Sequence, residues 1–93
     1  MYISPELWHR INLYKAKGGK KGRKRNVSRI NTFLKFCRTE RQKKTPYEIG
    51  KRDIHEFFEQ KNLSPRTAQD YYYAIKILWQ QLLGRPSDPP RPR

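Results

Sequence analysis

Few side chains in this sequence could do covalent chemistry, and three consecutive tyrosines are the first to consider. Tyr71, Tyr72 and Tyr73 carry phenol oxygens that could attack a phosphodiester. Such an attack needs cations that stabilise the phosphoryl transition state and a positioned acid or base, and residues 66–82 hold no such set. Tyr71 and Tyr72 fit an apolar helical stripe, while Tyr73 faces elsewhere, so we predict core tyrosines and no catalytic residue.

The two histidines and the one cysteine do not form a metal or redox site by their spacing. His9 and His55 are far apart in sequence, and neither has a nearby set of ligands at zinc spacing. Cys37 cannot form a disulfide within the chain and falls on an apolar stripe, which predicts a small core residue. We expect no metal and no cofactor, and a protein that works in a reducing, intracellular compartment.

The acidic residues between positions 45 and 83 could suggest acid–base catalysis. Three of them, Asp53, Glu56 and Glu59, are interspersed with cations at Lys51, Arg52 and Lys61. Such a mixture is typical of a solvated helix face, and we expect these carboxylates to be exposed.

Positive charge is the dominant feature of the composition. The 93 residues carry 22 Lys and Arg against 8 Asp and Glu, for a net charge of +14 and an isoelectric point near 10.4. Residues 15–44 hold thirteen of the basic residues and one acid, a local net charge of +12. Such a cluster repels itself, and a polyanion would relieve that repulsion while releasing its own counterions. The alternatives are a basic loop kept for solubility, or a membrane surface, but the run has no apolar face with which to bind lipid.

Caps and apolar spacing predict four helices and no strand. The first begins at Ser4-Pro5 and ends before Gly18, and a flexible basic loop follows. The second runs from about Asn26 or Ser28 to Thr39, with apolar residues at 27, 30, 34 and 37. A capping box at Thr45–Glu48 opens a short turn, and the third helix covers about 51–60.

The fourth helix has the clearest pattern, because a Ser64-Pro65 start precedes a long apolar stripe. The stripe holds Ala68, Tyr71, Tyr72, Ile75, Leu78, Trp79 and Leu82, and Gly84 with Pro86 ends the helix. We therefore predict an all-α, four-helix domain over residues 1–84, with a Pro- and Arg-rich tail or interdomain linker over 85–93.

Two helix starts combine backbone N–H groups with cations and hydroxyls, which suits phosphate. One is Ser64, Arg66 and Thr67, and the other is the basic segment that leads into the second helix. We expect nucleic-acid contacts from Lys17, Lys20, Lys21, Arg23, Lys24, Arg25, Asn26, Ser28, Arg29, Ser64, Arg66, Thr67, Arg91 and Arg93.

Five segments resemble the N-terminal core-binding (SAM-like) domain of tyrosine recombinases and phage integrases. They are residues 29–37, 45–49, 53–58, 63–67 and 72–79, in that order. In that family four helices form half of a clamp around a recombination half-site, and a Leu-Ser-x-x-Thr motif opens the last helix. Leu63, Ser64 and Thr67 match this motif, and residues 84–93 match the basic linker to the catalytic domain.

The resemblance implies a duplex-DNA-binding protein that is not itself an enzyme, since the family's catalytic residues lie in a second domain absent from this sequence. It implies double-stranded DNA as partner, together with a recombinase or a catalytic domain of its own, and a bacterial, cytoplasmic, nucleoid-associated location. Two alternatives stay open at this point. The chain could be a stand-alone DNA-binding regulator or recombinase cofactor, or an RNA-binding protein.

Overall fold

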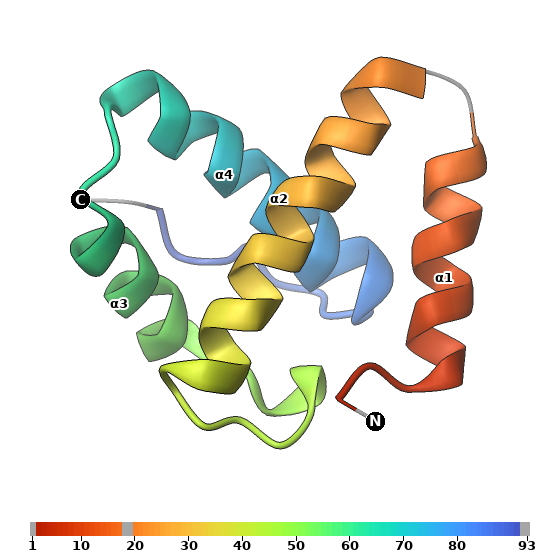
Figure 1. Ribbon diagram of the computed structural model, residues 1–93, viewed down its shortest axis with the longest axis horizontal. Helices are drawn as coiled ribbons and strands as arrows, with labels where there is room; N and C mark the ends of the chain where they lie inside the picture. The colour runs from red at the N-terminus through yellow and green to blue at the C-terminus, as the bar shows by residue number, and fades with distance from the viewer. Residues whose placement is uncertain (1, 18–19, 92–93) are drawn as a thin grey trace.

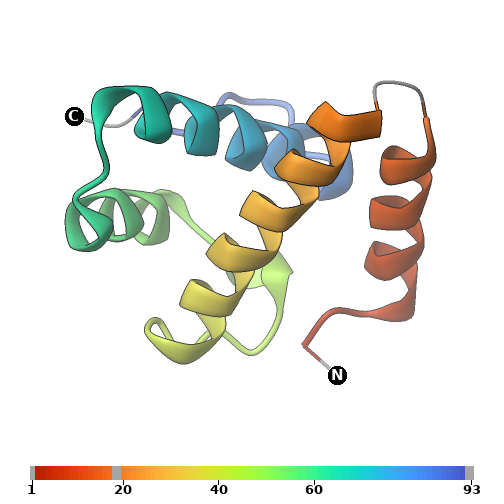
Figure 2. The same ribbon diagram turned by 45° about the horizontal axis from the view of Figure 1, so that its top comes forward.

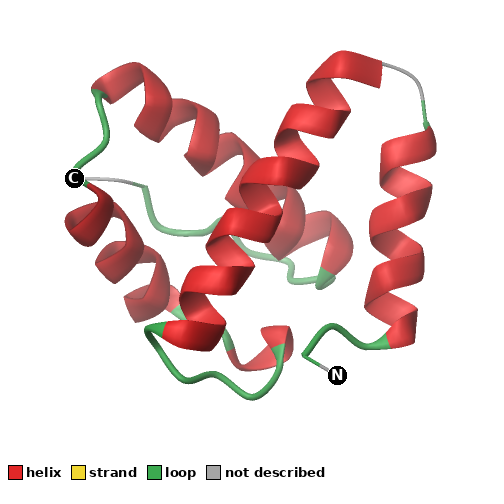
Figure 3. Cartoon of the chain, in the orientation of Figure 1, coloured by secondary structure: helices red, strands yellow, loops and turns green. Residues whose placement is uncertain are grey.

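A computed structural model describes residues 2–17 and 20–91, apart from the side chains of Lys20 and Lys21. This part of the chain consists of helices and loops and contains no strand (Figure 3). The elements are α1 (Pro5–Ala16), α2 (Lys20–Thr39), the 3-10 turn η1 (Pro46–Glu48), α3 (Lys51–Lys61), α4 (Pro65–Ile77) and the π-helical turn η2 (Leu78–Leu82). The all-α prediction is therefore confirmed.

The long helix α2 is the centre of the arrangement. It runs antiparallel to α1 on one side and crosses in front of α4, while α3 lies on the other side, below the start of α4 (Figures 1 and 2). Each helix turns an apolar face toward α2. The buried hydrophobic residues of the core are Leu7, Ile11, Tyr14, Val27, Ile30, Phe33, Leu34, Phe36, Cys37, Ile49, Ile54, Phe57, Ala74, Ile75, Ile77, Leu78, Trp79 and Leu82.

The ring of Phe57 joins three helices within this core. Its centroid lies 5.2 Å from that of Phe33 and 5.3 Å from that of Phe36, both on α2, and both pairs are edge-to-face. It also lies 5.3 Å from the ring of Tyr71 on α4. Edge-to-face pairs place the positive ring edge against the negative face of the neighbour, so this cluster fixes orientation as well as burying area.

The predicted helix starts at Ser4 and Ser64 are confirmed. The Ser4 hydroxyl accepts a hydrogen bond from the Leu7 amide at 3.2 Å, and Ser64 accepts one from the Thr67 amide at 3.4 Å. In both helices proline follows the cap, where its missing N–H costs nothing. The predicted bounds of α1, α3 and the turn at Pro46 also agree with the structure.

The predicted start of the second helix is wrong, because α2 begins at Lys20 rather than near Asn26 or Ser28. Lysine and arginine are good helix formers, and one glycine at position 22 costs only about 1 kcal/mol relative to alanine. The contacts of Arg23 and Asn26 with α1, described below, outweigh that cost. Most of the segment expected to be a flexible basic loop is therefore part of helix α2.

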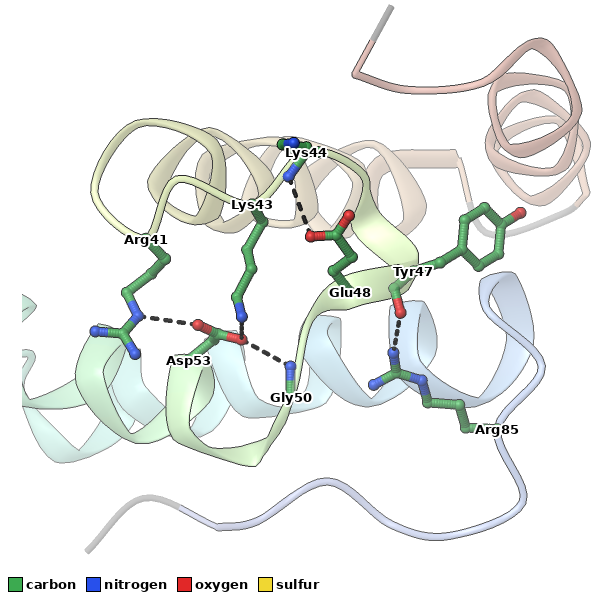
Figure 4. Close-up of polar contacts among 8 residues, drawn as sticks. All are labelled: Arg41, Lys43, Lys44, Tyr47, Glu48, Gly50, Asp53 and Arg85. Carbon is green, nitrogen blue, oxygen red and sulfur yellow. Dashed lines mark hydrogen bonds and ion pairs between the residues drawn. The ribbon is translucent and has the colours of Figure 1, made fainter.

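The predicted capping box at Thr45 is also wrong. The Thr45 side chain makes no cap hydrogen bond, and Glu48 accepts only a long bond of 3.4 Å from the Lys44 amide (Figure 4). A carboxylate does cap the next helix, since the Gly50 amide donates to Asp53 Oδ2 at 2.7 Å.

Asp53, expected to be solvated, is a buried carboxylate at 1% exposure. Arg41 Nε donates to its Oδ1 at 2.9 Å, and Lys43 Nζ lies 3.5 Å from Oδ2 (Figure 4). Burial by itself raises the pKa of Asp53, but the Gly50 amide, Arg41 and Lys43 together lower it below its ordinary value. The expectation failed because charge alternation on α3 gives no sign that the 41–43 loop folds over this position.

Residues 85–91 form an extended segment that returns along α4. The Arg85 guanidinium stacks 4.1 Å from the Trp79 ring and donates to the Tyr47 carbonyl at 3.0 Å. Further along, Gln80 donates to Asp88 at 2.6 Å and the Tyr72 hydroxyl donates to the Pro89 carbonyl at 3.3 Å. The predicted tail thus contacts α4 and η2 at several points along its described length.

We expect Asp53→Asn to lower the free energy of unfolding at pH 7 by about 1–3 kcal/mol, because the charge-assisted bonds to two cations are lost. A folded-state pKa below the unfolded value makes this contribution present above about pH 4 and lost as pH falls through the folded pKa. Urea unfolding of both proteins should therefore show a difference in the free energy of unfolding at pH 7 that becomes smaller at pH 3. An equal difference at both pH values would show that the ionised Asp53 carboxylate does not contribute to stability.

Candidate nucleic-acid interface

The N-terminal half of α2 concentrates positive charge where a helix least favours it. Five of the six residues 20–25 are Lys or Arg, and the first turn holds no acid. The N-terminal end of a helix carries a partial positive charge, so cations there are destabilising. This segment therefore needs contacts that offset the repulsion, or an anion.

The C-terminal end of α1 supplies such contacts. The Arg23 guanidinium donates to the Tyr14 carbonyl at 2.9 Å and lies 4.5 Å from the Tyr14 ring centroid. Asn26 donates from its amide to the Tyr14 hydroxyl at 3.1 Å. The Tyr14 carbonyl, in the last turn of α1, thus accepts from a cation at the positive end of α2 as well as from the Lys17 amide at 3.3 Å.

Two of the predicted contact residues on this segment project into solvent instead. Lys24 and Arg25 are exposed, and neither has a hydrogen bond or ion pair within the described part of the chain. Ser28 is exposed one turn further on, and Lys17 is exposed just after α1. Lys20 and Lys21 have side chains outside the described residues.

A groove between α1 and α2, with a volume of about 520 Å³, runs beside these residues and is called the lysine groove below. It is lined by Lys15, Lys24, Val27, Ser28, Asn31, Thr32 and Lys35. Lysines stand at both ends of its α2 side, and hydroxyl and amide groups lie between them. Cations flanking polar groups suit a ligand with phosphates on the outside and hydrogen-bonding edges in the middle.

Lys15, Asn31, Thr32 and Lys35 were missed as site residues from the sequence. Positions 24, 28, 31 and 35 follow the same helical spacing as the apolar positions 27, 30, 34 and 37, displaced around the helix. The sequence therefore contains a polar stripe at these four positions. It was missed because a helix that begins at 26 or 28 does not include Lys24. Lys15 joins the groove only through the packing of α1 against α2.

The second helix start predicted to bind phosphate is that of α4. Arg66 is exposed there, and the Ser64 hydroxyl donates to the Thr67 hydroxyl at 3.0 Å. The starts of α2 and α4 both lie along the upper edge of the molecule in Figures 1 and 2, well apart from each other. The fold therefore places both helix starts along one edge without joining them into a single pocket.

Arg29 and Arg91 have intramolecular partners. Arg29 lies 3.8 Å from Asp70 in an ion pair between α2 and α4, and Arg91 lies 5.4 Å from the Tyr72 ring centroid. Arg93 is outside the described residues. The ion pair of Arg29 is long and partly exposed, so it contributes little to stability and leaves the cation near the surface.

Cys37 lies in the core as predicted, whereas Tyr71 and Tyr72 are only partly buried. Tyr71 packs on Phe57, Tyr72 contacts Pro89, and Tyr73 is exposed. Cys37 is fully buried, and burial raises its pKa to about 12, so its thiol stays protonated at neutral pH. None of the described helices is long and apolar enough to span a lipid bilayer.

Fold and surface together define a small all-helical domain with one strongly cationic edge. The chain belongs to the family described as phage integrase, N-terminal SAM-like domain, whose model matches residues 12–88. This match confirms the resemblance found in the sequence and indicates a recombinase-associated role in DNA binding. No curated protein and no solved structure gave a significant match.

We expect Arg23→Ala to lower the free energy of unfolding by about 1–2 kcal/mol, since it removes a charged hydrogen bond and a cation–π contact with Tyr14. Arg25→Ala is the matched control, because it deletes the same side chain two residues away where no contact is present. That control should stay within about 0.5 kcal/mol of wild type. Denaturant melts of both variants measure the difference, and equal stability of the two would show that Arg23 does not hold α1 to α2.

Proposed function

We propose that this chain binds double-stranded DNA as the core-binding domain of an integrase-type tyrosine recombinase. The observation that carries the proposal is the concentration of outward-facing cations on the N-terminal half of α2, beside the lysine groove. Membership in the integrase N-terminal family supports the choice of DNA among polyanions. The high net charge of the chain adds attraction at long range.

The lysine groove suggests how a duplex would be contacted. Lys24 and Lys35 are eleven residues apart on α2, a rise of ~16 Å along the helix axis. The major groove of B-DNA is ~12 Å wide. A helix lying across that groove would bring each lysine to a phosphate wall, with Ser28, Asn31 and Thr32 facing the base edges between them.

Further contacts come from the other predicted residues along the same edge. Arg66 and the amides at the start of α4 would hold a second stretch of phosphates, away from the lysine groove. The full proposed set is Lys17, Lys20, Lys21, Arg23, Lys24, Arg25, Asn26, Ser28, Arg29, Ser64, Arg66, Thr67, Arg91 and Arg93, to which the groove adds Lys15, Asn31, Thr32 and Lys35. Arg23 and Asn26 would act mainly by holding the helix in place, because their side chains already contact Tyr14.

We further propose that the chain does no chemistry itself. Strand cleavage and rejoining would belong to a catalytic domain, which residues 85–93 would join as a linker to the DNA-binding unit over 1–84. Such a protein would act on DNA in the bacterial cytoplasm. The alternative is a stand-alone regulator that occupies the same DNA, and the open reading frame beyond Arg93 distinguishes the two.

We expect duplex binding to weaken steeply with salt. If about six cations reach phosphates, the logarithm of the association constant should fall with that of the salt concentration at a slope of about −5. Fluorescence anisotropy with a labelled duplex at several salt concentrations measures the slope. A slope near zero would overturn the electrostatic interpretation, and tighter binding to RNA of equal length would favour the RNA-binding alternative.

We expect the double variant Lys24→Ala/Lys35→Ala to reduce the steepness of that slope by about 2, because each lost phosphate contact removes about one released counterion. Lys51→Ala/Lys61→Ala is the control, since it removes two exposed lysines from α3 with the same change in net charge. Equal loss in both double variants would show that only the overall charge matters. Asn31→Ala should reduce discrimination between duplex sequences more than it reduces affinity for random duplex.

A further inference from the structure

A second groove, with a volume of about 630 Å³, lies at the end of the α1–α2 pair away from the basic helix start. It is lined by Tyr2, Ile3, Pro5, Trp8, His9, Asn12 and Arg38, and is called the apolar groove below. Trp8 is 51% exposed, although burying an indole is among the larger gains that a side chain can make. A cleft of this size with an exposed aromatic ring is typical of a binding site.

The apolar groove lies away from the basic start of α2, although Asn12 and Arg38 are each one helical turn from a lysine of the lysine groove. Trp8 belongs to the first half of α1 and Arg38 to the last turn of α2. Because the two helices are antiparallel, both residues lie at the end opposite Lys20–Arg25 (Figure 1). An occupant of this groove would leave the basic start of α2 uncovered.

The lining residues restrict the chemistry of the occupant. Most of the lining is apolar or aromatic, so DNA, which needs several cations along its backbone, fits poorly. None of the described lining residues is acidic, and Arg38 is exposed without an ion pair in the described part of the chain. A second copy of this chain would bring the same arginine and another net charge of +14, which opposes pairing. Charge complementarity therefore favours an occupant that carries carboxylates.

We propose that the apolar groove binds an acidic amphipathic segment of another protein. An aliphatic or aromatic side chain of that segment packs against Trp8 and Ile3, and a carboxylate pairs with Arg38. Asn12 and His9 supply further hydrogen bonds along the edge. The inference does not depend on DNA binding, because it uses residues at the other end of the helix pair.

The probe is a fluorescein-labelled helical peptide of about 12 residues, with leucine and phenylalanine on one face and glutamate on the other. A matched peptide has glutamine in place of each glutamate. Anisotropy titrations use wild type, Trp8→Ala, Arg38→Ala and Arg25→Ala, the last of which removes an equal charge at the DNA end. Thermal melts show whether each variant is folded. If Trp8→Ala is not folded, Trp8→Phe, which keeps an aromatic ring, takes its place.

We expect the glutamate peptide to bind wild type, with about tenfold weaker binding to Trp8→Ala and about fivefold weaker binding to Arg38→Ala. Arg25→Ala should change binding by less than about twofold. A loss in Arg25→Ala equal to that in Arg38→Ala would overturn the proposal, because the peptide would then be a general counterion. Absence of binding would also overturn it, and so would a wild-type dimer in sedimentation that Trp8→Ala abolishes.

Discussion

The fold depends on how the cationic start of α2 is held in place. Like charges repel one another there, at the helix end where the backbone dipole is also positive. The C-terminal end of α1 offsets this repulsion. Its Tyr14 contacts Arg23 through the carbonyl and the ring face, and Asn26 through the hydroxyl. Among the described side chains of the segment, Arg23 and Asn26 are used in this way. Lys24 and Arg25 stay exposed, and the proposed contact with DNA rests on them.

At the C-terminal end of α2, the following loop covers the buried carboxylate of Asp53. Asp53 caps α3 and is held by Arg41 and Lys43, so the loop after α2 is fixed to the start of the next helix. A buried charge without partners would be strongly destabilising, and these contacts make the loop position specific. Phe57 then lies against α2 and α4, and the ladder of aromatic contacts sets how the helices cross. The way in which α2 and α4 cross therefore also sets where their first turns lie on the upper edge of the domain.

The domain therefore has two chemically different ends joined by the α1–α2 pair. One end has the exposed cations at the start of α2, and the other has an apolar groove in which an exposed indole lies with Arg38. Residues 85–91 lie along α4 and contact Trp79 and Tyr72, so the path of the chain beyond the last helix is fixed as well. A protein that binds DNA at one end could also contact a partner at the other.

The sequence by itself determined the class of fold, three of the four helix starts and the family. Caps such as Ser4 and Ser64 and the apolar stripe through Ile75 and Trp79 are local signals, and local hydrogen bonds and burial decide them. The structure alone decided the start of α2, the burial of Asp53 and the joining of Lys15 to Lys24 and Lys35 in one groove. Each of these depends on a contact between residues distant in the chain, Arg23 with Tyr14, Arg41 with Asp53, or α1 with α2. No local pattern records such contacts, because their free energy exists only once the helices are packed.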